Sequence, residues 1–583
     1  MRTANVDRRW EVAEPVSEEF RARFPELHPV AVQLLGNRGL ETQEQVDEFL
    51  LPDYGHDLHD PFLFREMQAA CDRIFLAIEG GERVVVHGDY DADGVSGTAI
   101  LLTAFREVAT LAGGDPSLFV SYIPHREHEG YGLNSETVRR LAADGCTLLV
   151  TIDCGISNAE EIALAEELGM ETIVVDHHQV PERVPECILI HPLVPGETYP
   201  YGNLAAAGVG FKVASALYEV ARRRGLDIPV GREKWLLDLV AIATVTDFMK
   251  LIGENRTLEK WGLVVLNKTR RPGLRQLIQS AGLELGRLDT VSVGFYIGPR
   301  INAASRMDHA DLALETVMAE DDGRAAELAV RLNACNVDRQ KLTEEIVRQA
   351  HLVIEDGRRI QVLAGDGWSA GIVGIVAGRL TTELGVPVFV LGRQEDGRLV
   401  GSGRSIPGFD VMQLLRRAES SLARFGGHPE ACGLTVADND KLVEFRRLAN
   451  EYADEILTDR DLRPVLRIEC ELQTSQIDWS LISELERFEP FGVGNPRPLF
   501  FLSGLQLRSV QPVGRDGKHA RVSVLGDRPQ ETKLIGFGLA AKLAEFSPGD
   551  TIDTVVELGI NQWNGTRTIQ VRLVDVRPGG GAP

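Results

Sequence analysis

Three segments of the chain end an apolar run with acidic or imidazole side chains. The segment VVVHGDYDADG (84–94) places one histidine and three aspartates directly after consecutive valines. The runs TLLVTID (147–153) and ETIVVDHH (171–178) end in the same way, with Asp153 and with Asp176, His177 and His178. Carboxylates that gather at one place repel one another unless a cation or a shared proton compensates their charge. An ordinary polar turn explains any one of these ends, but three ends that all carry acidic or imidazole side chains favour a metal site.

The elements that must position these residues are strands separated by helices. Strands are predicted at 83–89, 117–123, 147–153 and 171–178, with helical patterns at 95–112, 135–143 and 158–169. Apolar, β-branched strands joined through helices form a parallel sheet with both faces covered. Ligands bind such sheets at the carboxyl ends of the strands. The acidic and imidazole groups are therefore expected to meet at one edge.

The types of ligand at this edge favour a hard divalent cation. Carboxylate oxygens mixed with imidazole nitrogens suit Mn²⁺ or Mg²⁺ better than structural zinc, which prefers Cys and His. The apolar helix predicted at 235–247 adds Asp247 as a further candidate. Asp238 in the same helix is the alternative, although an exposed or capping position explains that residue more simply.

Length and composition predict a soluble protein of several domains. A chain of 583 residues is too long for one core, and 44% hydrophobic with 25% charged residues is typical of globular proteins. The sequence shows no apolar membrane span or secretory signal, and its seven cysteines form no C-x-x-C pair. We therefore expect a cytoplasmic protein with reduced thiols. The net charge of −24 argues mildly against a passive nucleic-acid coat but allows an enzyme with local basic grooves.

The segments that contain these acidic and imidazole residues also resemble a known family. In order, HGDYDADG, Asp153 in TIDCG, VVDHH and TVTD resemble the four motifs of the DHH phosphoesterase superfamily. Other segments are similar to the RecJ family of single-strand-specific DNA exonucleases, namely IPHREHEGYGLN (123–134), GPRINAASRM (298–307), GWSAGIVGIVAGRL (367–380), SGRS (402–405), FGGHPEACG (425–433), FEPFGVGNPRPLF (488–500) and NQWNGTRTIQVRLVDVRP (561–578). The resemblance covers almost the whole chain and is least distinctive over 1–50.

Two features depart from the family pattern. Ser369 stands in GWSAG where RecJ-like chains usually carry a histidine, which alters a polar contact near the cleft. The segment TVTDFMKL replaces the commoner small and valine residues around Asp247, and we interpret it as a packing change that spares the ligand.

The resemblance implies two divalent metal ions, Mn²⁺ or Mg²⁺, at the carboxyl edge of the predicted sheet. One ion is expected on His87, Asp91 and Asp153. The other is expected on Asp93, Asp153, His177 and Asp247, so that Asp153 bridges the two ions. Asp89 lies outside the family's H-x3-D-x-D motif and is not expected to bind either ion. By similarity, His178 stands beside the scissile phosphate and Asp176 orients the histidine pair as a hydrogen-bond acceptor. Two ions of this kind allow phosphodiester hydrolysis without a covalent nucleophile. The implied activity is 5′→3′ degradation of single-stranded DNA in repair and recombination.

The resemblance also implies residues that grip the strand. A glycine-rich turn with Ser402, Arg404 and Ser405 is expected to hold the 5′ end together with Gly426, Gly427 and His428; an ordinary hairpin turn is the alternative. Further expected contacts are Arg300, Asn302 and Arg306, with a helix N-terminus as the alternative explanation for Asn302. Arg126 and Tyr131 offer a cation and a stacking ring, and simple packing is the alternative for Tyr131.

The expected fold class is α/β, in five parts. An N-terminal extension (1–70) precedes a parallel-sheet DHH catalytic domain (71–310), a long connecting helix (311–355), a smaller α/β DHH-associated domain (356–458) and a C-terminal OB-type β-barrel of five strands (459–583). By resemblance, the connecting helix leaves a passage too narrow for duplex DNA. Candidates for a strand-binding face on the barrel are Arg508, Arg515, Lys518, Arg521 and Trp563, with packing beside a turn as the alternative for Trp563.

Two other classes of function remain open at this point. One is a relative that cleaves oligoribonucleotides or small phosphodiesters, which the barrel disfavours because a short substrate needs no extended binding surface. The other is a non-catalytic repair or replication scaffold, which the complete ligand set disfavours. The partners that the resemblance implies are single-stranded DNA, a single-strand-binding protein and a RecQ-type helicase. It also implies a monomer without membrane contact.

Overall fold

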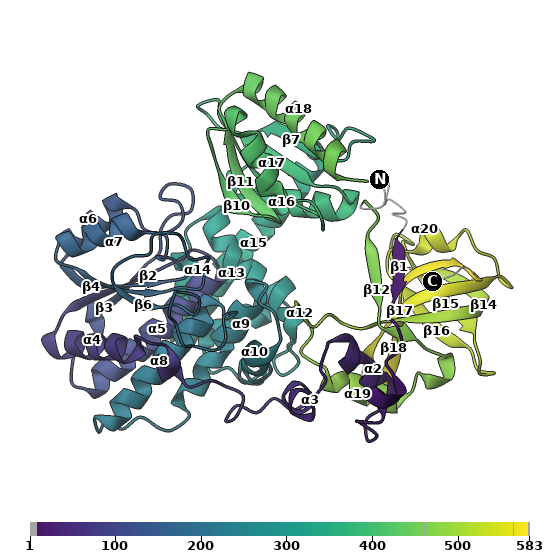
Figure 1. Ribbon diagram of the computed structural model, residues 1–583, viewed down its shortest axis with the longest axis horizontal. Helices are drawn as coiled ribbons and strands as arrows, with labels where there is room; N and C mark the ends of the chain where they lie inside the picture. The colour runs from purple at the N-terminus through teal and green to yellow at the C-terminus, as the bar shows by residue number, and fades with distance from the viewer. Residues whose placement is uncertain (1–7, 459–461, 564, 581–583) are drawn as a thin grey trace.

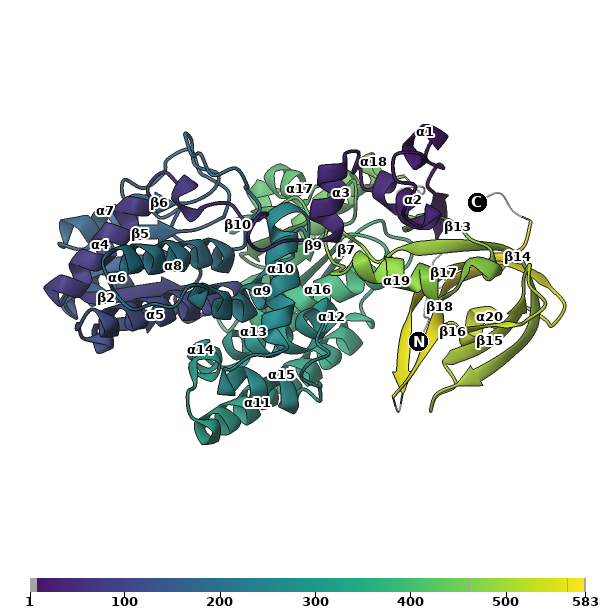
Figure 2. The ribbon, with the colours of Figure 1, turned by 90° about the horizontal axis from the view of Figure 1, so that it is seen from below.

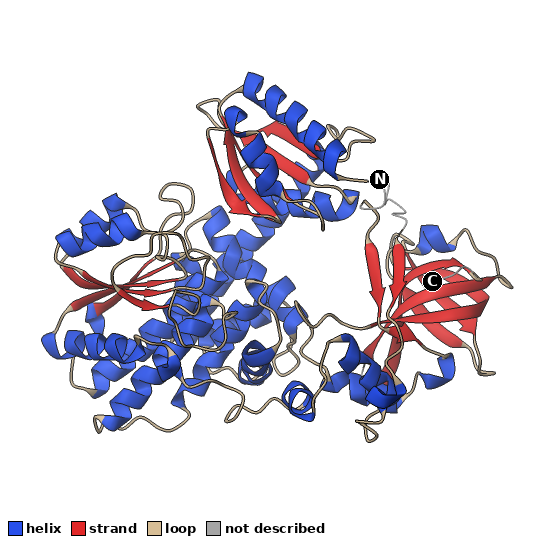
Figure 3. Ribbon diagram, viewed as in Figure 1, coloured by secondary structure: helices blue, strands red, loops and turns tan. Residues whose placement is uncertain are grey.

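The protein folds into three lobes arranged around an open centre, as the computed structural model in Figure 1 shows. The structure describes residues 8–458, 462–563 and 565–580. One lobe carries a parallel sheet covered by helices, the second a mixed sheet, and the third a β-barrel, which Figure 3 distinguishes by secondary structure. Within these described ranges, no helix is both long and apolar enough to span a bilayer.

The predicted parallel sheet of the first lobe is confirmed. Its strand order is β3-β2-β4-β5-β6, and all four pairings are parallel. The strands are β2 (Arg83–Gly88), β3 (Phe119–Tyr122), β4 (Cys146–Ile152), β5 (Glu171–Val175) and an unpredicted fifth strand, β6 (Ile188–Ile190). In the register, Gly88 pairs with Ile152 and Ile152 with Val175. The three segments that carry the acidic and imidazole side chains therefore leave the sheet at the same level.

Helices cover both faces of this sheet, because alternate strand residues are apolar on each side. Val84 and Val86 join a core with α4 (Met67–Gly80), α5 (Ala92–Leu111) and α8 (Ala206–Arg223). Val85 joins a second core with α6 (Ser135–Ala143) and α7 (Ala159–Glu167). Figure 2 shows α5 and α8 running side by side beneath the sheet.

A helical layer extends this lobe toward the open centre of the molecule. It consists of α9 (Leu237–Thr246), α10 (Gly253–Leu266), α11 (Pro272–Ser280), α12 (Thr290–Ser292), the single π-turn η4 (Val293–Ile297) and α13 (Gly298–Met307). Asp247 caps the carboxyl end of α9, as the predicted helix at 235–247 requires.

The prediction of one connecting helix over 311–355 is wrong, because the segment forms two helices. These are α14 (Asp311–Met318) and α15 (Asp322–Ala350). The backbone of Ala319 is extended between them. The Asp321 carboxylate then accepts a hydrogen bond from Arg324 N at 2.8 Å, which caps the start of a new helix. Helix α14 packs on α5 and α11 of the first lobe, so within this segment α15 is the helix that leads to the second lobe.

The second lobe contains the mixed sheet β10-β11-β9-β8-β7. Its strands are β7 (Gln361–Asp366), β8 (Val388–Arg393), β9 (Leu399–Arg404), β10 (Arg424–His428) and β11 (Ala431–Val436), with helices α16 (Ala370–Leu384), α17 (Val411–Arg417) and α18 (Asn439–Ile456). The predicted glycine-rich turn at Ser402 and Arg404 is wrong, because both residues lie inside β9 and alternate with glycines that neighbouring side chains cover.

The third lobe is the predicted barrel. The five expected strands are β14 (Leu499–Val513), β15 (His519–Leu525), β16 (Thr532–Gly536), β17 (Thr551–Trp563) and β18 (Thr566–Pro578), and the short β13 (Cys470–Glu471) adds a sixth. Pairing of β14 with β17 closes the sheet on itself. The small helix α20 (Ala540–Leu543) follows β16.

Residues 9–50 belong to the barrel lobe instead of standing apart as an extension. The strand β1 (Arg9–Val12) pairs in parallel with β12 (Val465–Ile468). After α1 (Glu18–Arg21), the apolar faces of α2 (Pro29–Asn37) and α3 (Gln43–Leu50) enter the same core as α19 (Trp479–Arg487) and the barrel strands. Residues more than 400 positions apart thus share one core, which local sequence patterns do not reveal.

Arg256 on α10 joins the barrel lobe to the first lobe. Its side chain is buried and donates hydrogen bonds to the carbonyl oxygens of Phe49, Arg487, Glu489 and Pro490 at 2.7, 3.2, 3.1 and 3.3 Å. The guanidinium also stacks on Phe49, 3.8 Å from the ring centroid. One side chain therefore ties α3 and the segment after α19 to the first lobe.

We expect Arg256→Ala to lower the free energy of unfolding by about 3 kcal/mol, because it leaves buried carbonyls without donors. Lys260→Ala is the matched control, since Lys260 donates to the Glu489 carbonyl from the exposed side of the same helix. Denaturant unfolding followed by circular dichroism measures both variants. An equal loss in the two variants would show that Arg256 does not hold the lobes together.

Candidate metal centre

The strand ends that carry aspartates and histidines meet at one edge of the sheet, as the sequence predicts. Among the described residues, three sets of side chains bring ligand atoms within 4.8 Å of one another. The sets are Asp153, His177 and His178; Asp93, His177 and Asp247; and Asp89, Asp91 and Asp153. Carboxylate oxygens and imidazole nitrogens at this spacing form the donor set of a hard divalent cation.

His177 occupies the middle of the best-defined set. Its Nε2 atom lies 3.3 Å from Asp153 Oδ1, 3.6 Å from Asp247 Oδ2 and 3.7 Å from Asp93 Oδ2. Both Nε2 and Asp247 Oδ2 are buried without a hydrogen-bond partner in the described structure. Buried polar atoms without partners are rare in folded proteins. A metal ion between these four side chains would satisfy them, so the residues fit the cation that the sequence predicts.

The local fold holds the carboxylates in place. Asp91 caps α5 by accepting hydrogen bonds from Asp93 N at 2.9 Å and Gly94 N at 3.2 Å. Asp93 accepts hydrogen bonds from Ala206 N and Ala207 N, at the start of α8, at 2.8 and 2.7 Å. A Cβ atom on Gly94 would approach the backbone of Asp89 to 2.4 Å, so the loop requires glycine there.

Electrostatic repulsion in this cluster is strong. Burial, followed by repulsion from Asp91, raises the pKa of Asp93 to about 7. Burial, followed by repulsion from Asp93, raises the pKa of Asp247 to about 8 and that of Asp153 well above its usual range. Burial lowers the pKa of His177 to about 4, so its imidazole is neutral and able to bind a metal. These shifts report a negative site that a divalent cation would stabilise.

The other predicted ion site differs in part from expectation. Asp89, which the predicted frame leaves out, lies with Asp91 and Asp153, and its buried Oδ1 has no hydrogen-bond partner in the described structure. His87 belongs to none of the three sets of described residues. Its ring is fully buried, with Nδ1 3.6 Å from Cys154 Sγ and with Nε2 unpartnered in the described structure. Its role as a ligand stays a prediction.

Asp176 orients His178, in the arrangement expected from the sequence. Asp176 Oδ1 accepts hydrogen bonds from His178 Nδ1 at 2.8 Å and from His177 N at 2.7 Å, and Oδ2 accepts from Ile156 N at 3.0 Å. Burial opposes a charge on His178, but the hydrogen bond to Asp176 and the negative charges of Asp176, Asp247 and Asp93 together outweigh it and raise the His178 pKa to about 9. Tyr131 donates its hydroxyl to Asp153 O at 3.0 Å and reaches His178, so this ring belongs to the metal centre.

Arginines from three segments line the neighbourhood of the metal centre. Arg126 stacks on Tyr90 at 4.4 Å, and Arg306 donates to Gly371 O at 2.6 Å across the boundary between the first two lobes. Burial, followed by the charges of Arg126 and Arg339, lowers the pKa of Arg306 to about 9. Arg404 contributes to the same shift from the second lobe. These side chains therefore form one basic cluster beside the acidic site.

Arg339 was missed from the sequence. It lies on α15, donates to Asn336 Oδ1 at 2.9 Å, and has its pKa lowered by burial and by Arg300. The apolar periodicity of α15 marks which residues face the core but not which polar residues face the second lobe, so no signal in one sequence identifies it.

The two glycine-containing motifs of the second lobe lie at one level of its sheet. In β11, Gly433 pairs with Ser402 on one side and with Gly426 on the other, and Ala431 likewise pairs with Arg404 and His428. Ser405 follows β9 directly, and Gly427 lies between Gly426 and His428 on the edge strand β10. The sheet thus brings the predicted 5′-end residues to the same height, on strands separated by β11.

Two residues predicted to grip the strand have structural partners. Asn302 lies inside α13, not at its N-terminus, and its Oδ1 accepts a hydrogen bond from Ala92 N at 2.7 Å, at the start of α5. Arg300 donates to Asn333 Oδ1 at 3.0 Å and to Tyr296 O at 2.8 Å.

Two further residues of the sequence prediction are settled by their contacts. Ser369 caps α16 by accepting from Gly371 N at 3.2 Å. Asp238 is not an exposed residue, because it is buried and accepts a hydrogen bond from Thr269 Oγ1 at 2.7 Å.

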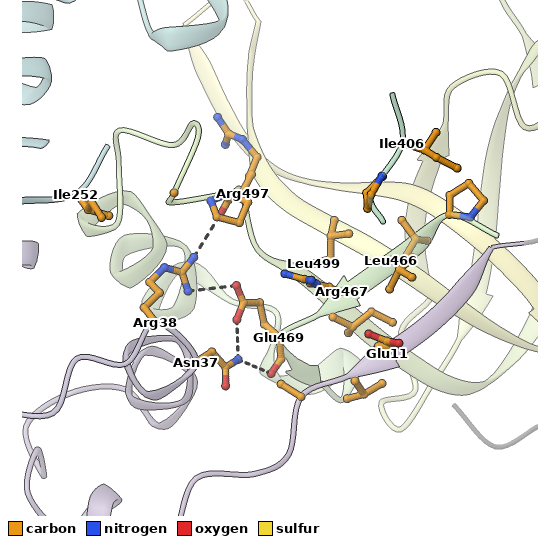
Figure 4. A pocket seen from close by; sticks show the side chains of 18 of the residues that line it. Glu11, Asn37, Arg38, Ile252, Ile406, Leu466, Arg467, Glu469, Arg497 and Leu499 are labelled. Atoms are coloured by element: carbon orange, nitrogen blue, oxygen red, sulfur yellow. Dashed lines mark hydrogen bonds and ion pairs between the residues drawn. The ribbon is translucent and has the colours of Figure 1, made fainter. Parts of the chain in front are cut away.

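A large cavity lies away from the metal centre, between the three lobes. Its volume is about 1520 Å³, and it is lined by β1, β12, the loops at 252–253 and 405–407, and Arg497. Figure 4 shows Arg38 and Asn37 bonded to Glu469 on its wall. Of the predicted DNA-binding residues whose side chains the structure describes, only Ser405 lines it, and none of the predicted metal ligands, all of them described, does so.

The predicted binding face of the barrel is partly described. Arg508, Arg515 and Arg521 are exposed, and Lys518 pairs with Asp516 at 2.9 Å. Trp563 ends β17, but its side chain lies outside the described part of the structure.

Comparison with known proteins shows the same organisation. Family models match three parts of the chain: the DHH family N-terminal domain at 83–244, the DHHA1 domain at 357–455 and the RecJ OB domain at 468–575. The single-stranded-DNA-specific exonuclease RecJ of Bacillus subtilis is 35% identical over 574 residues, which cover 97% of this chain and 70% of that protein.

Solved structures agree with the sequence comparisons. The crystal structure of Thermus thermophilus RecJ with Mn²⁺ matches with a TM-score of 0.82 at 30% identity, over 98% of this chain and 80% of that one. The Mg²⁺ complex of the same protein matches with a TM-score of 0.76 at 29% identity, over 98% and 79% of the two chains. With this likeness along nearly its whole length, the chain belongs to the RecJ family.

Proposed function

We propose that the protein is a metal-dependent exonuclease that hydrolyses single-stranded DNA from the 5′ end, in DNA repair and recombination. The observation that carries this proposal is the unpartnered Nε2 atom of His177 between three carboxylates, at a sheet edge that faces a basic cluster. The acidic site suits divalent cations and the arginines suit a polyanion, so the two together suit a phosphodiester substrate. The Bacillus subtilis relative, a single-stranded-DNA-specific exonuclease, supports the same activity.

The metal ligands proposed for this chain are Asp91, Asp93, Asp153, His177 and Asp247, with His87 and Asp89 as the two candidates that complete the first ion's set. Divalent cations at such a site neutralise the attacked phosphate and make water a better nucleophile. Asp176 keeps His178 oriented and protonated. The imidazolium then offers positive charge beside the phosphate and a proton for the leaving oxygen.

Strand selection is assigned to the rest of the molecule. We place catalysis in 71–310, recognition of the 5′ end in 356–458 and further strand contacts in the barrel lobe, with 311–355 between them. Arg306 crosses from the first lobe to Gly371 of the second, so the approach to the metal centre is bounded by both. A single strand with free bases fits such an approach, whereas a paired duplex is excluded by its width.

The proposed partners follow from this substrate. A helicase of the RecQ type would generate unpaired strands, and a single-strand-binding protein would keep them open. The cytoplasm is the proposed compartment, because all seven cysteines are free.

Replacing the central carboxylate tests the metal assignment. We expect Asp153→Asn to lower the rate of hydrolysis of end-labelled single-stranded DNA with Mn²⁺ by roughly 1000-fold, since it removes a charge shared by two ligand sets. Asp144→Asn, at an exposed position after α6, is the control and should keep full activity. Circular dichroism confirms that both variants fold. Turnover near the wild-type rate in Asp153→Asn would dismiss the assignment.

Metal binding should also stabilise the protein in a pH-dependent way. The carboxyl pKa values of Asp93 and Asp247 are raised to about 7 and about 8, so in the metal-free protein these groups hold protons that the unfolded chain releases. The free energy of unfolding therefore falls as the pH rises from about 4 toward about 8. Because a cation replaces these protons, the rise in Tm on adding Mn²⁺ should be larger near pH 8 than near pH 6. A shift of the same size in Asp153→Asn would argue against this site.

Recognition of the 5′ end is tested with Arg404. We expect Arg404→Gln to raise the KM for 5′-phosphorylated strands by roughly tenfold and to leave the KM for 5′-hydroxyl strands nearly unchanged, because the guanidinium can bind a terminal phosphate. Arg424→Gln is the matched control, since Arg424 begins the exposed strand β10, at the opposite end from His428. Equal effects on both kinds of strand would contradict a role at the 5′ phosphate.

A further inference from the structure

Phe248 directly follows the proposed metal ligand Asp247 and has an unusual conformation. It is the first residue after the helix cap of α9, with a φ of +56°, and its N–H donates to Val245 O at 3.3 Å. Glycine is the usual residue at this position, because a side chain is strained in the left-handed region. The interpretation of this segment as a packing change holds for Val245 and Met249, which pack against the core, but not for Phe248, of which 76% is exposed.

This strain is confined to the metal centre. Within the described ranges, Asp153 and Phe248 are the two residues other than glycine that have a positive φ. Asp153 is itself a proposed metal ligand, and Phe248 directly follows Asp247, another proposed ligand. Strained backbone persists at functional sites where its geometry is needed. For Phe248 the fold gains no buried surface in return, so contact with something outside the protein is the remaining benefit.

Another exposed aromatic side chain lies on η4, the turn that packs against the helix before Phe248. The π-turn η4 packs on the last turn of α9, where a Cβ atom on Gly294 would lie 3.4 Å from Val245. Phe295 on this turn is 75% exposed, and single π-turns occur frequently at functional sites. On its other side, the loop after Phe248 bonds to the barrel lobe through Leu251 N and Val493 O at 2.7 Å.

This loop also leads from the metal centre to the large cavity. Ile252, four residues after Phe248, is partly exposed and lines the cavity between the lobes. A strand that has its scissile phosphate at the metal centre and continues to this cavity would pass the side chain of Phe248.

We propose that Phe248 stacks on a nucleobase next to the scissile phosphate, an inference that rests on the proposed nuclease function. Because Phe248 directly follows Asp247 and its side chain is exposed, its ring is available to a substrate held at the metal centre. Aromatic rings stack on bases of any sequence, but only where the base is not already paired and stacked in a duplex. Phe248 is thus a base-contacting residue that favours unpaired strands at the point of cleavage.

The test compares strands that carry or lack the base. We expect Phe248→Gly to lower kcat/KM on single-stranded DNA roughly 5- to 100-fold, the range of one stacked base. On strands with an abasic site beside the cleaved bond, wild type and Phe248→Gly should differ by less than about twofold. Phe248→Trp should keep the preference for the base. The Tm of Phe248→Gly should be no lower than that of the wild type, because glycine adopts this backbone without strain.

A binding measurement that needs no metal completes the test. With 2-aminopurine placed at successive positions of the strand and EDTA present, wild-type protein should change the fluorescence most at one position. Phe248→Gly should remove that change and leave the others. Val230→Gly, at an exposed site in a loop before η3 (Arg232–Leu236), is the control and should behave as wild type in both measurements.

The outcomes separate this inference from the proposed function. If wild-type protein with Mn²⁺ leaves single-stranded DNA intact, the proposed function fails, and the inference falls with it. If wild type degrades DNA and Phe248→Gly loses the same factor on base-bearing and abasic strands, Phe248 acts by ordering Asp247 and the stacking proposal is overturned. Unchanged kinetics in Phe248→Gly overturn it as well.

Discussion

Repulsion between carboxylates at the carboxyl edge of a parallel sheet is the constraint on which the rest of this structure depends. The register of β2, β4 and β5 brings Asp89, Asp153 and Asp176 out at one level, whatever follows. Asp176 is neutralised locally, since a histidine and backbone amides donate to it. Compensation is incomplete at Asp89 and Asp153, because burial and the charges of neighbouring aspartates raise the pKa of both carboxyls well above the usual range. A divalent cation removes this repulsion and at the same time provides the reactivity proposed for the site.

The sequence predicts this part of the fold well, because its signals are local. Apolar strands, the intervening helices and the acidic ends are each visible within about ten residues, and the rule on strand ends brings them together. The failures have the opposite origin. The packing of α2 and α3 into the barrel core joins residues at opposite ends of the chain. The break between α14 and α15 depends on one capping aspartate within a continuous apolar pattern. Asn302 needed the fold to reveal that it caps another helix.

The three lobes must be held together for the site to have a specific approach. Arg256 supplies one connection, by satisfying carbonyls from α3 and from the segment before the barrel. Arg306 supplies another, between the metal lobe and the second lobe. Since both arginines bond to backbone carbonyls, these connections hold main chain rather than flexible side chains. The loop that follows Phe248 bonds to the barrel lobe through Leu251 and Val493, so a strand bound at this loop would meet residues of both lobes.

Anomalous diffraction from crystals grown with Mn²⁺, recorded at the manganese edge, tests the central claim most directly. The account predicts two strong peaks at the carboxyl edge of the sheet, one of them within bonding distance of Asp93, Asp153, His177 and Asp247, and the second sharing Asp153. A single peak elsewhere on the molecule, or crystals without a peak at this edge despite millimolar Mn²⁺, would contradict it.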